Sequence, residues 1–541
     1  MLNSSKRCSV LVSCLCLCCS CEVRIKHSLN KEEEEFIVTR RKSVFPTLGN
    51  LETHCNQNKM PNIALLGSGG GQRAMVGLLG SLVQLDKAGL LDCNLYLSGV
   101  SGSTWCMASL YQEPDWSTKL ETVKDKIIKR LSGPGKYYYE KDIFSLTDVW
   151  AVLIVTEYVK EIDEQKLSKQ WDQDSKDPFP IYTVIDKQCK QCKDGKDVWF
   201  EISPLEAGYS LTGAFVETSS FGSQFDNGSK KKQQPEMDML YLQALCGSAL
   251  ADEEEIRKFI WQKIKVCSCL FVVFSSKDPN DPLVEKCSQV LMDLVDKNLS
   301  VLNGIDPSAY DKSIRKTLKG NILKGSYDVA KKNIILCIWC NAMCLCKCVC
   351  ITDVCISICR CIAQWIWGRK YNFLHNMTDE TVPRALLESE TRDYEDAALL
   401  LNSPYFSVLR DERDIDLIIS LDFSEGDPFM TLTQTAEMCK KQKIHFPDVP
   451  VFPEEEKKNP KDFYVFTGQN APTVIHMPLF NVVNCGDDIE AWRKKYRTFQ
   501  DPYSAEMITD LMEAAGKNIS NNRERLKKEI CPKIPLVTDT A

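Results

Sequence analysis

Two consecutive strand–turn–helix patterns near the start of the chain constrain its fold most strongly. In the first, the apolar run Ile63–Leu66 leads into the glycine-rich segment Gly67–Gly71, and residues 75–91 carry apolar side chains at helical spacing. In the second, the apolar run 95–97 leads into the small-residue turn Gly99–Ser103 and another helical pattern. Strands that alternate with helices in this way are typical of α/β folds.

Apolar runs further along the chain extend this pattern. Residues 414–423 and 474–481 are expected to form buried strands, and residues 504–529 an amphipathic helix. Residues 113–200 are expected to be mainly helical, with Pro178 and Pro180 breaking the pattern before a strand-like segment at Ile181–Ile185. We therefore expect one large α/β domain around a central, largely parallel sheet, with helices on both faces and a cap built from the middle of the chain.

Composition excludes some classes of protein. Of the 541 residues, 44% are hydrophobic and 26% are charged, which allows a sizeable buried core. The formal net charge of −7 argues against a dedicated nucleic-acid binder, which usually has a basic face. Only five histidines occur, so few of them are available as catalytic bases.

The 27 cysteines are unevenly distributed. Six lie within Cys8–Cys21, a segment that resembles a signal peptide or a palmitoylation site and is equally compatible with a simple extension. Nine lie within Cys337–Cys361, which approaches the length of a membrane span but is interrupted by Lys347, Asp353 and Arg360. We favour an insertion there, and a membrane anchor remains the alternative. The scattered cysteines are typical of reduced thiols.

Ser101 is the candidate nucleophile. It lies in the sequence G-V-S-G-S, close to the nucleophile elbow G-x-S-x-G, and follows a strand and precedes a helix. Such an elbow needs small neighbours because the backbone turns sharply. The N-terminus of the following helix then offers amide donors to a developing oxyanion.

The glycine-rich loop strengthens this interpretation. It lacks the last glycine of a dinucleotide fingerprint, where Gln72 stands, and the Gly-Lys-Ser/Thr of a nucleoside triphosphate loop. Three successive glycines instead expose consecutive N–H groups, as an oxyanion hole requires. Arg73, just inside the next helix, can pair bidentately with a phosphate. These features together favour a phosphate-bearing ester as the substrate.

The two loops resemble motifs of a known family. The segments GSGGGQRA and SGVSGSTW resemble the glycine loop and the nucleophile motif of the cytosolic (group IV) phospholipases A2. Further segments match in the same order at residues 199–208, 211–225, 367–375, 419–429 and 476–481. The resemblance extends from about residue 60 to about residue 500 and is closest to the gamma type, which has no calcium-binding C2 domain. Only 62 residues precede the first strand, fewer than a β-sandwich of roughly 100 residues needs.

The resemblance implies a Ser–Asp dyad in place of a triad. The family's base lies in an Asp-x-Gly sequence that precedes Asn-x-Pro, and the matching segment places the base at Asp396. Ala398 stands where glycine is usual; a requirement for positive φ there would cost about 1 kcal/mol. Asp393 is the nearest competitor for this role. The resemblance also implies that Gly70 and Gly71 form the oxyanion hole and that Arg73 holds the substrate phosphate.

The fold implied is a catalytic domain like those of the patatins and the cytosolic phospholipases A2. The implied reaction is calcium-independent hydrolysis of a glycerophospholipid acyl ester through an acyl-serine, with possible lysophospholipase or acyl-transfer activity. No metal or organic cofactor is expected, and no protein partner can be inferred.

The expected organisation is an N-terminal extension at residues 1–60, a catalytic domain at 61–500 with a Cys-rich insert near 334–366, and a helix and tail at 501–541. The chain ends VTDTA, without a prenylation box, so prenyl anchoring is not expected. We expect a cytosolic protein that associates peripherally with intracellular membranes. The alternatives are a catalytically impaired lipid-binding homologue and an integral membrane protein anchored by the Cys-rich segments.

Overall fold

The computed structural model describes residues 22–50, 61–132, 146–151, 155–191, 198–248, 366–486, 488–498 and 500–530. The expectations for Cys8–Cys21, for the insert at 334–365 and for much of the middle of the chain therefore fall outside the described residues. Across the described ranges, no helix has both the length and the apolar character needed to cross a membrane.

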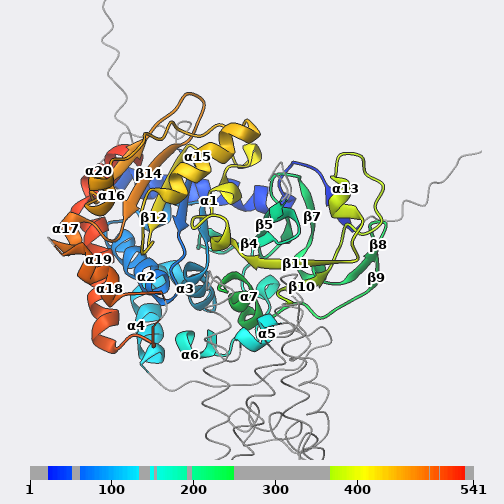
Figure 1. The fold of residues 1–541 in the computed structure, drawn as a ribbon, viewed down its shortest axis with the longest axis horizontal. Coiled ribbons are helices and arrows are strands. Elements are labelled where there is room, and N and C mark those ends of the chain that lie inside the picture. Colours follow the sequence, from blue (N-terminus) through cyan, green and yellow to red (C-terminus); the bar gives the residue numbers. More distant parts are fainter. Residues whose placement is uncertain are drawn as a thin grey trace, which may run out of the picture.

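A 12-stranded sheet dominates the structure, and its central part is parallel (Figure 1). Five strands lie side by side there in the order β4 (Phe179–Asp186), β3 (Tyr96–Gly99), β2 (Ile63–Gly67), β12 (Leu417–Asp422) and β14 (Thr473–Pro478). Nearly all of their side chains are buried, as in parallel sheets that are covered on both faces. The predicted α/β fold is confirmed, including the strands expected at 63–66, 414–423 and 474–481.

Antiparallel strands extend the sheet at both ends. One end carries β5 (Trp199–Ile202), β6 (Glu206–Tyr209), β7 (Ala214–Glu217) and β1 (Val23–Ile25), and the other carries β13 (Tyr464–Phe466). Off this path, β11 (Thr391–Asp396) pairs with β4 and with β10 (Arg369–Tyr371). A separate ribbon joins β8 (Gln224–Asp226) to β9 (Ser229–Lys232).

Helices pack against the parallel part of the sheet. The predicted helix after the glycine loop is α2 (Gln72–Lys87), and the helix after the elbow is α3 (Gly102–Tyr111). The expected C-terminal helix is divided into α19 (Ala505–Asn521) and α20 (Arg523–Ile530). Figure 1 shows α19 on the same side as α2 and α4 (Leu120–Leu131), and α19 contacts both. The C-terminal segment is thus packed onto the helix that follows the glycine loop.

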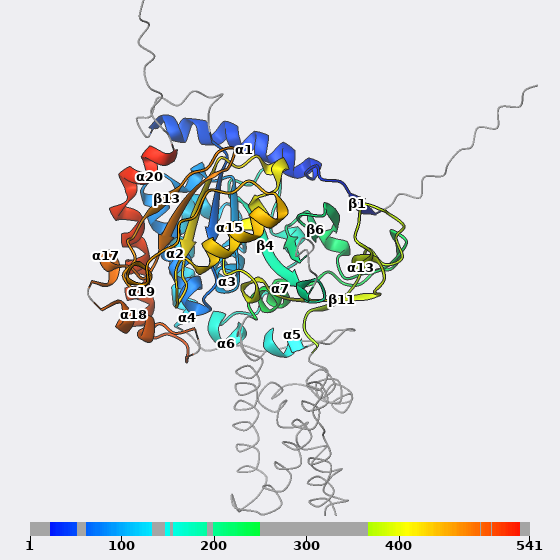
Figure 2. The ribbon, with the colours of Figure 1, turned by 45° about the horizontal axis from the view of Figure 1, so that its top comes forward.

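The N-terminal segment is also packed against the sheet. Figure 2 shows α1 (Lys31–Asn50) running along the top of the molecule, after β1 has paired with β7. Glu33 of this helix is fully buried and pairs with Arg413 at 2.9 Å, and Arg413 also pairs with Glu201 at 2.8 Å. Burial alone would raise the pKa of Glu201, but Arg413 and Arg410 outweigh it and hold that pKa at about 2. An ion network therefore joins α1 to the sheet.

Candidate active site

Ser101 lies in the sharp turn between β3 and α3. Its backbone has φ 51° and ψ −124°, a conformation that non-glycine residues rarely adopt and that is typical of functional sites. Its carbonyl oxygen accepts hydrogen bonds from the N–H of Thr104 at 2.9 Å and from the Thr104 hydroxyl at 2.5 Å. Ser101 is therefore held at the positive end of the α3 dipole, as an elbow nucleophile should be.

The glycine loop lies directly against this elbow. A Cβ atom on Gly102 would stand 1.8 Å from the carbonyl oxygen of Gly71, so only glycine fits after the nucleophile. The N–H groups of Ser68 and Gly69 donate to the carbonyls of Leu421 and Asn402. Those of Gly70 and Gly71 donate to no other residue of the described ranges. Two uncommitted amides are thus present where the sequence predicts an oxyanion hole.

Asp396 approaches the elbow from the opposite direction. Gly99, the last residue of β3, pairs with Tyr182 of β4, and Asp396, the last residue of β11, pairs with Val184. Strand β5 occupies the other edge of β4, so β3 and β11 share one edge and their ends meet there. Two residues of a strand span about 7 Å. The register therefore brings the end of β11 next to the turn that carries Ser101.

The segment after Asp396 lies beside the glycine loop and Ser101. Asp396 is fully buried, and its Oδ1 accepts the N–H of Ala398 at 2.9 Å. A Cβ atom on Gly69 would lie 3.0 Å from Ser101 Cβ and 3.4 Å from Ala398 Cβ. Ser101 and Ala398 therefore both lie next to Gly69. The Ser101 hydroxyl makes no hydrogen bond to a residue that the structure describes.

Ala398 does not have the positive φ that would have made alanine costly. It lies in a 3₁₀ turn, Ala397–Leu399, and is not among the non-glycine residues with positive φ. The departure from the family's glycine therefore introduces no backbone strain at this position. The competitor Asp393 is paired with Arg369 at 2.6 and 2.8 Å, which leaves it less suited to act as a base.

Asn402 has a structural role that the sequence did not indicate. Its carbonyl oxygen accepts the N–H of Gly69 at 2.9 Å, and its side-chain amide donates to the Gly69 carbonyl at 3.2 Å and to the Ser424 hydroxyl at 2.8 Å. Ser424 in turn donates to Asp422 at 2.7 Å, and burial raises the pKa of Asp422 to about 6. The Asn-x-Pro motif used to locate Asp396 was the available signal for this contact.

Arg73 is buried beside Gly70 and is held by backbone carbonyls. It is 1% exposed, and its Nε and Nη1 donate at 2.6 Å to the carbonyls of Phe423 and Tyr496. Its Nη2 donates to the Thr498 hydroxyl at 3.2 Å, and its Nη1 lies 3.5 Å from a Glu425 carboxylate oxygen. Phosphate binding by Arg73 stays a prediction, and in this conformation four of the five N–H donors of the guanidinium face other residues.

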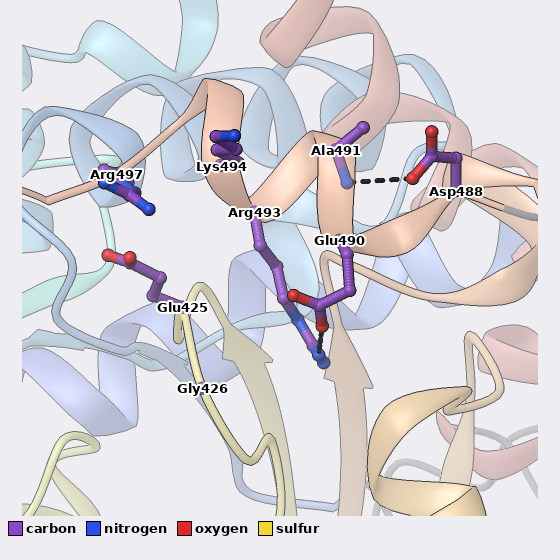
Figure 3. A pocket seen from close by; sticks show the side chains of 8 residues that line it. All are labelled: Glu425, Gly426, Asp488, Glu490, Ala491, Arg493, Lys494 and Arg497. Atoms are coloured by element: carbon purple, nitrogen blue, oxygen red, sulfur yellow. Dashed lines mark hydrogen bonds and ion pairs between the residues drawn. The ribbon is translucent and has the colours of Figure 1, made fainter.

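A polar pocket of about 500 Å³ adjoins Glu425 (Figure 3). Its lining residues are Glu425, Gly426, Asp488, Glu490, Ala491, Arg493, Lys494 and Arg497. None of the predicted catalytic residues lines it, so the pocket adjoins the surroundings of Arg73 and not the nucleophile. In the described part of the chain, no three metal-binding side chains cluster together.

Comparisons with known proteins identify the family of the chain. Residues 63–133 and 139–251 match the family described as the lysophospholipase catalytic domain. The chain is 32% identical to cytosolic phospholipase A2 gamma of Mus musculus, over 93% of this chain and 91% of that protein. It is 31% identical to cytosolic phospholipase A2 gamma of Homo sapiens, over 94% and 96%. The structure of human GIVD cytosolic phospholipase A2 has the same fold, with a TM-score of 0.65 and 20% identity over 94% of this chain and 68% of that one. These matches confirm the resemblance seen in the sequence, and the chain belongs to the cytosolic phospholipase A2 family of ester hydrolases.

Proposed function

We propose that the chain is a calcium-independent phospholipase A2 that cleaves the acyl ester of glycerophospholipids through Ser101 and Asp396. The observation that supports this most directly is the register of β4, on which the ends of β3 and β11 meet. That register brings a buried carboxylate and a serine in an elbow turn to the same edge of β4. Such a pair is what a two-residue nucleophilic mechanism needs.

The proposed reaction has two halves. Asp396 takes the proton of the Ser101 hydroxyl as Oγ attacks the acyl carbonyl, and the N–H groups of Gly70 and Gly71 stabilise the oxyanion. Asp396 then protonates the departing lysophospholipid oxygen, leaving an acyl-serine. Water, deprotonated by Asp396, attacks this ester, and Asp396 returns the proton to Ser101 Oγ as the fatty acid leaves. A lysolipid hydroxyl in place of water would give acyl transfer, and a lysolipid substrate would give lysophospholipase activity.

Arg73 is proposed to hold the substrate phosphate, because its charge is fixed beside the glycine loop. Every proposed step is carried by this chain's own side chains and amides, so we expect hydrolysis in the presence of chelator. The relatives are named cytosolic phospholipases A2, and we propose the same setting here, with peripheral association with intracellular membranes.

The test compares purified wild-type, Ser101→Ala, Asp396→Asn and Asp393→Asn proteins on phosphatidylcholine vesicles in excess chelator, with released fatty acid as the readout. Loss of Ser101 or Asp396 is expected to lower the rate by roughly 10³-fold or more, because the two act as one unit. The Asp393 variant, a matched loss of one nearby carboxylate, is expected to retain activity. Undiminished hydrolysis by Ser101→Ala would overturn the assignment.

A covalent probe gives a second readout of the nucleophile. One solved structure of human GIVD cytosolic phospholipase A2 is a complex with methyl γ-linolenyl fluorophosphonate. A serine nucleophile can displace fluoride from such a compound, so we expect the wild type to be labelled and Ser101→Ala not to be. A folded wild type that binds vesicles but neither hydrolyses lipid nor reacts with the probe would favour a catalytically impaired lipid-binding homologue.

A further inference from the structure

Three hydrogen-bond donors converge on one carboxylate oxygen of Glu425. The backbone N–H and the hydroxyl of Thr498 donate to Oε2 at 3.0 and 3.1 Å, and Arg73 Nη1 lies 3.5 Å from the same atom. An arginine together with an amide and a hydroxyl is a donor set that suits a phosphate oxygen as well as a carboxylate. Glu425 therefore fills what would otherwise be an anion site.

The two sides of this contact differ in how firmly they are fixed. Arg73 is 1% exposed and is held at 2.6 Å by the carbonyls of Phe423 and Tyr496, neither of which depends on Glu425. The Glu425 side chain is 40% exposed, and its distance to Arg73 is at the limit of a hydrogen bond. Glu425 can thus swing away while Arg73 keeps its place.

The pocket beside Glu425 is lined by three carboxylates and three cations. Arg493 is paired with Glu490 at 2.7 Å, whereas Lys494 and Arg497 form no ion pair with any residue in the described ranges. In Figure 3 the guanidinium of Arg497 is turned toward the Glu425 carboxylate. These two cations can stabilise a phosphate that enters the pocket or the carboxylate that it displaces.

We propose that Glu425 stands in for the substrate phosphate: its carboxylate fills the site formed by Arg73 and Thr498 until a phosphate group displaces it. Glu425 is therefore a specificity-determining residue. Only a ligand whose anionic group binds Arg73 and Thr498 more tightly than this carboxylate gains access to the site. The inference rests on the proposed function in one respect, namely that the phosphate belongs to the lipid substrate.

The first experiment measures binding without turnover. Inorganic phosphate is titrated calorimetrically into Ser101→Ala and into the double variant S101A/E425Q, each as the full chain. Removing the competing charge is expected to lower the Kd for phosphate by roughly 2- to 5-fold, the range for a partly exposed ion pair. The control S101A/E513Q removes the same charge from the exposed face of α19 and is expected to bind phosphate as Ser101→Ala does. An unchanged or raised Kd in S101A/E425Q overturns the proposal.

The second experiment asks whether the phosphate is that of the lipid. The KM of Glu425→Gln is compared for a phospholipid and for a diacylglycerol, which carries the same esters without phosphate. The proposal is supported if the ratio of the phospholipid KM to the diacylglycerol KM is lower for Glu425→Gln than for the wild type. Tighter binding of inorganic phosphate with an unchanged ratio overturns the assignment to the lipid headgroup and points to soluble phosphate. Because the binding experiment uses Ser101→Ala, its result stands whether or not the chain hydrolyses lipid.

Discussion

The N–H of Ala398 donates a hydrogen bond to the Asp396 carboxylate, 2.9 Å away. This bond fixes the orientation of the carboxylate, and a carboxylate has further lone pairs beyond the one that accepts it. The proposed dyad thus depends on a backbone amide of the same turn, and not on the side chain at position 398.

Replacing Ala398 by glycine is expected to leave kcat within about twofold of wild type, because φ at this position is not positive and alanine introduces no strain. Ala398→Pro removes the N–H and is expected to lower kcat by roughly 10-fold or more, the worth of a hydrogen bond to a charged group. Fatty-acid release at saturating lipid measures both, with circular dichroism to confirm folding. A tenfold gain in Ala398→Gly would show instead that alanine impairs the enzyme.

Asp422 is expected to make stability depend on pH. Burial raises its pKa to about 6, so between its ordinary pKa and about 6 the folded state binds more protons than the unfolded state. The free energy of unfolding contributed by this group therefore falls as pH rises through that window, by on the order of 3 kcal/mol.

Urea unfolding of wild type and Asp422→Asn at pH 4.5 and pH 7.5 checks this expectation. The asparagine keeps an acceptor for Ser424 but does not titrate. The free energy of unfolding of the variant, relative to that of the wild type, should therefore be higher at pH 7.5 than at pH 4.5. Asp510→Asn, an exposed carboxylate on α19, is the control for general charge effects. Equal differences at both pH values would contradict the raised pKa of Asp422.

Arg413 is expected to be essential for stability. It is fully buried between Glu33 of α1 and Glu201 of β5, so Arg413→Met leaves two buried carboxylates without their common partner. Breaking such a pair typically costs about 3–5 kcal/mol. Lys517→Met, which removes the exposed partner of Glu513, should cost less than about 1 kcal/mol. Comparable losses from the two substitutions would argue that the buried network does not hold α1 in place.

The sequence predicted those structural features that depend on residues close together in the chain. The two strand–turn–helix units, the elbow around Ser101 and the glycine loop were all predicted, since each depends on residue types within a few positions of one another. The meeting of β3 with β11 was not derivable from those patterns, because it depends on the register of β4. The contact between Asn402 and Gly69 and the burial of Arg73 likewise depend on segments more than 300 residues apart.

The burial of Glu33 in the N-terminal helix illustrates the same limit. Residues 31–50 are rich in charge, and nothing in their local pattern indicates a buried partner. The partner of Glu33 is Arg413, which follows 380 residues later. Interactions between charged residues at that distance leave no periodicity in the sequence that could reveal them.

The pairing of β2 with β12 also sets the order in which this chain can fold. Leu417 pairs with Ile63, so one edge of β2 has no partner until roughly 350 further residues have been synthesised. At about 5–20 residues per second, a ribosome needs roughly 20–70 s for that stretch. Throughout that interval the edge of a buried, apolar strand is open to other chains. Folding of this protein in the cell therefore calls for protection of the nascent chain, and a truncated product ending before β12 is expected to aggregate.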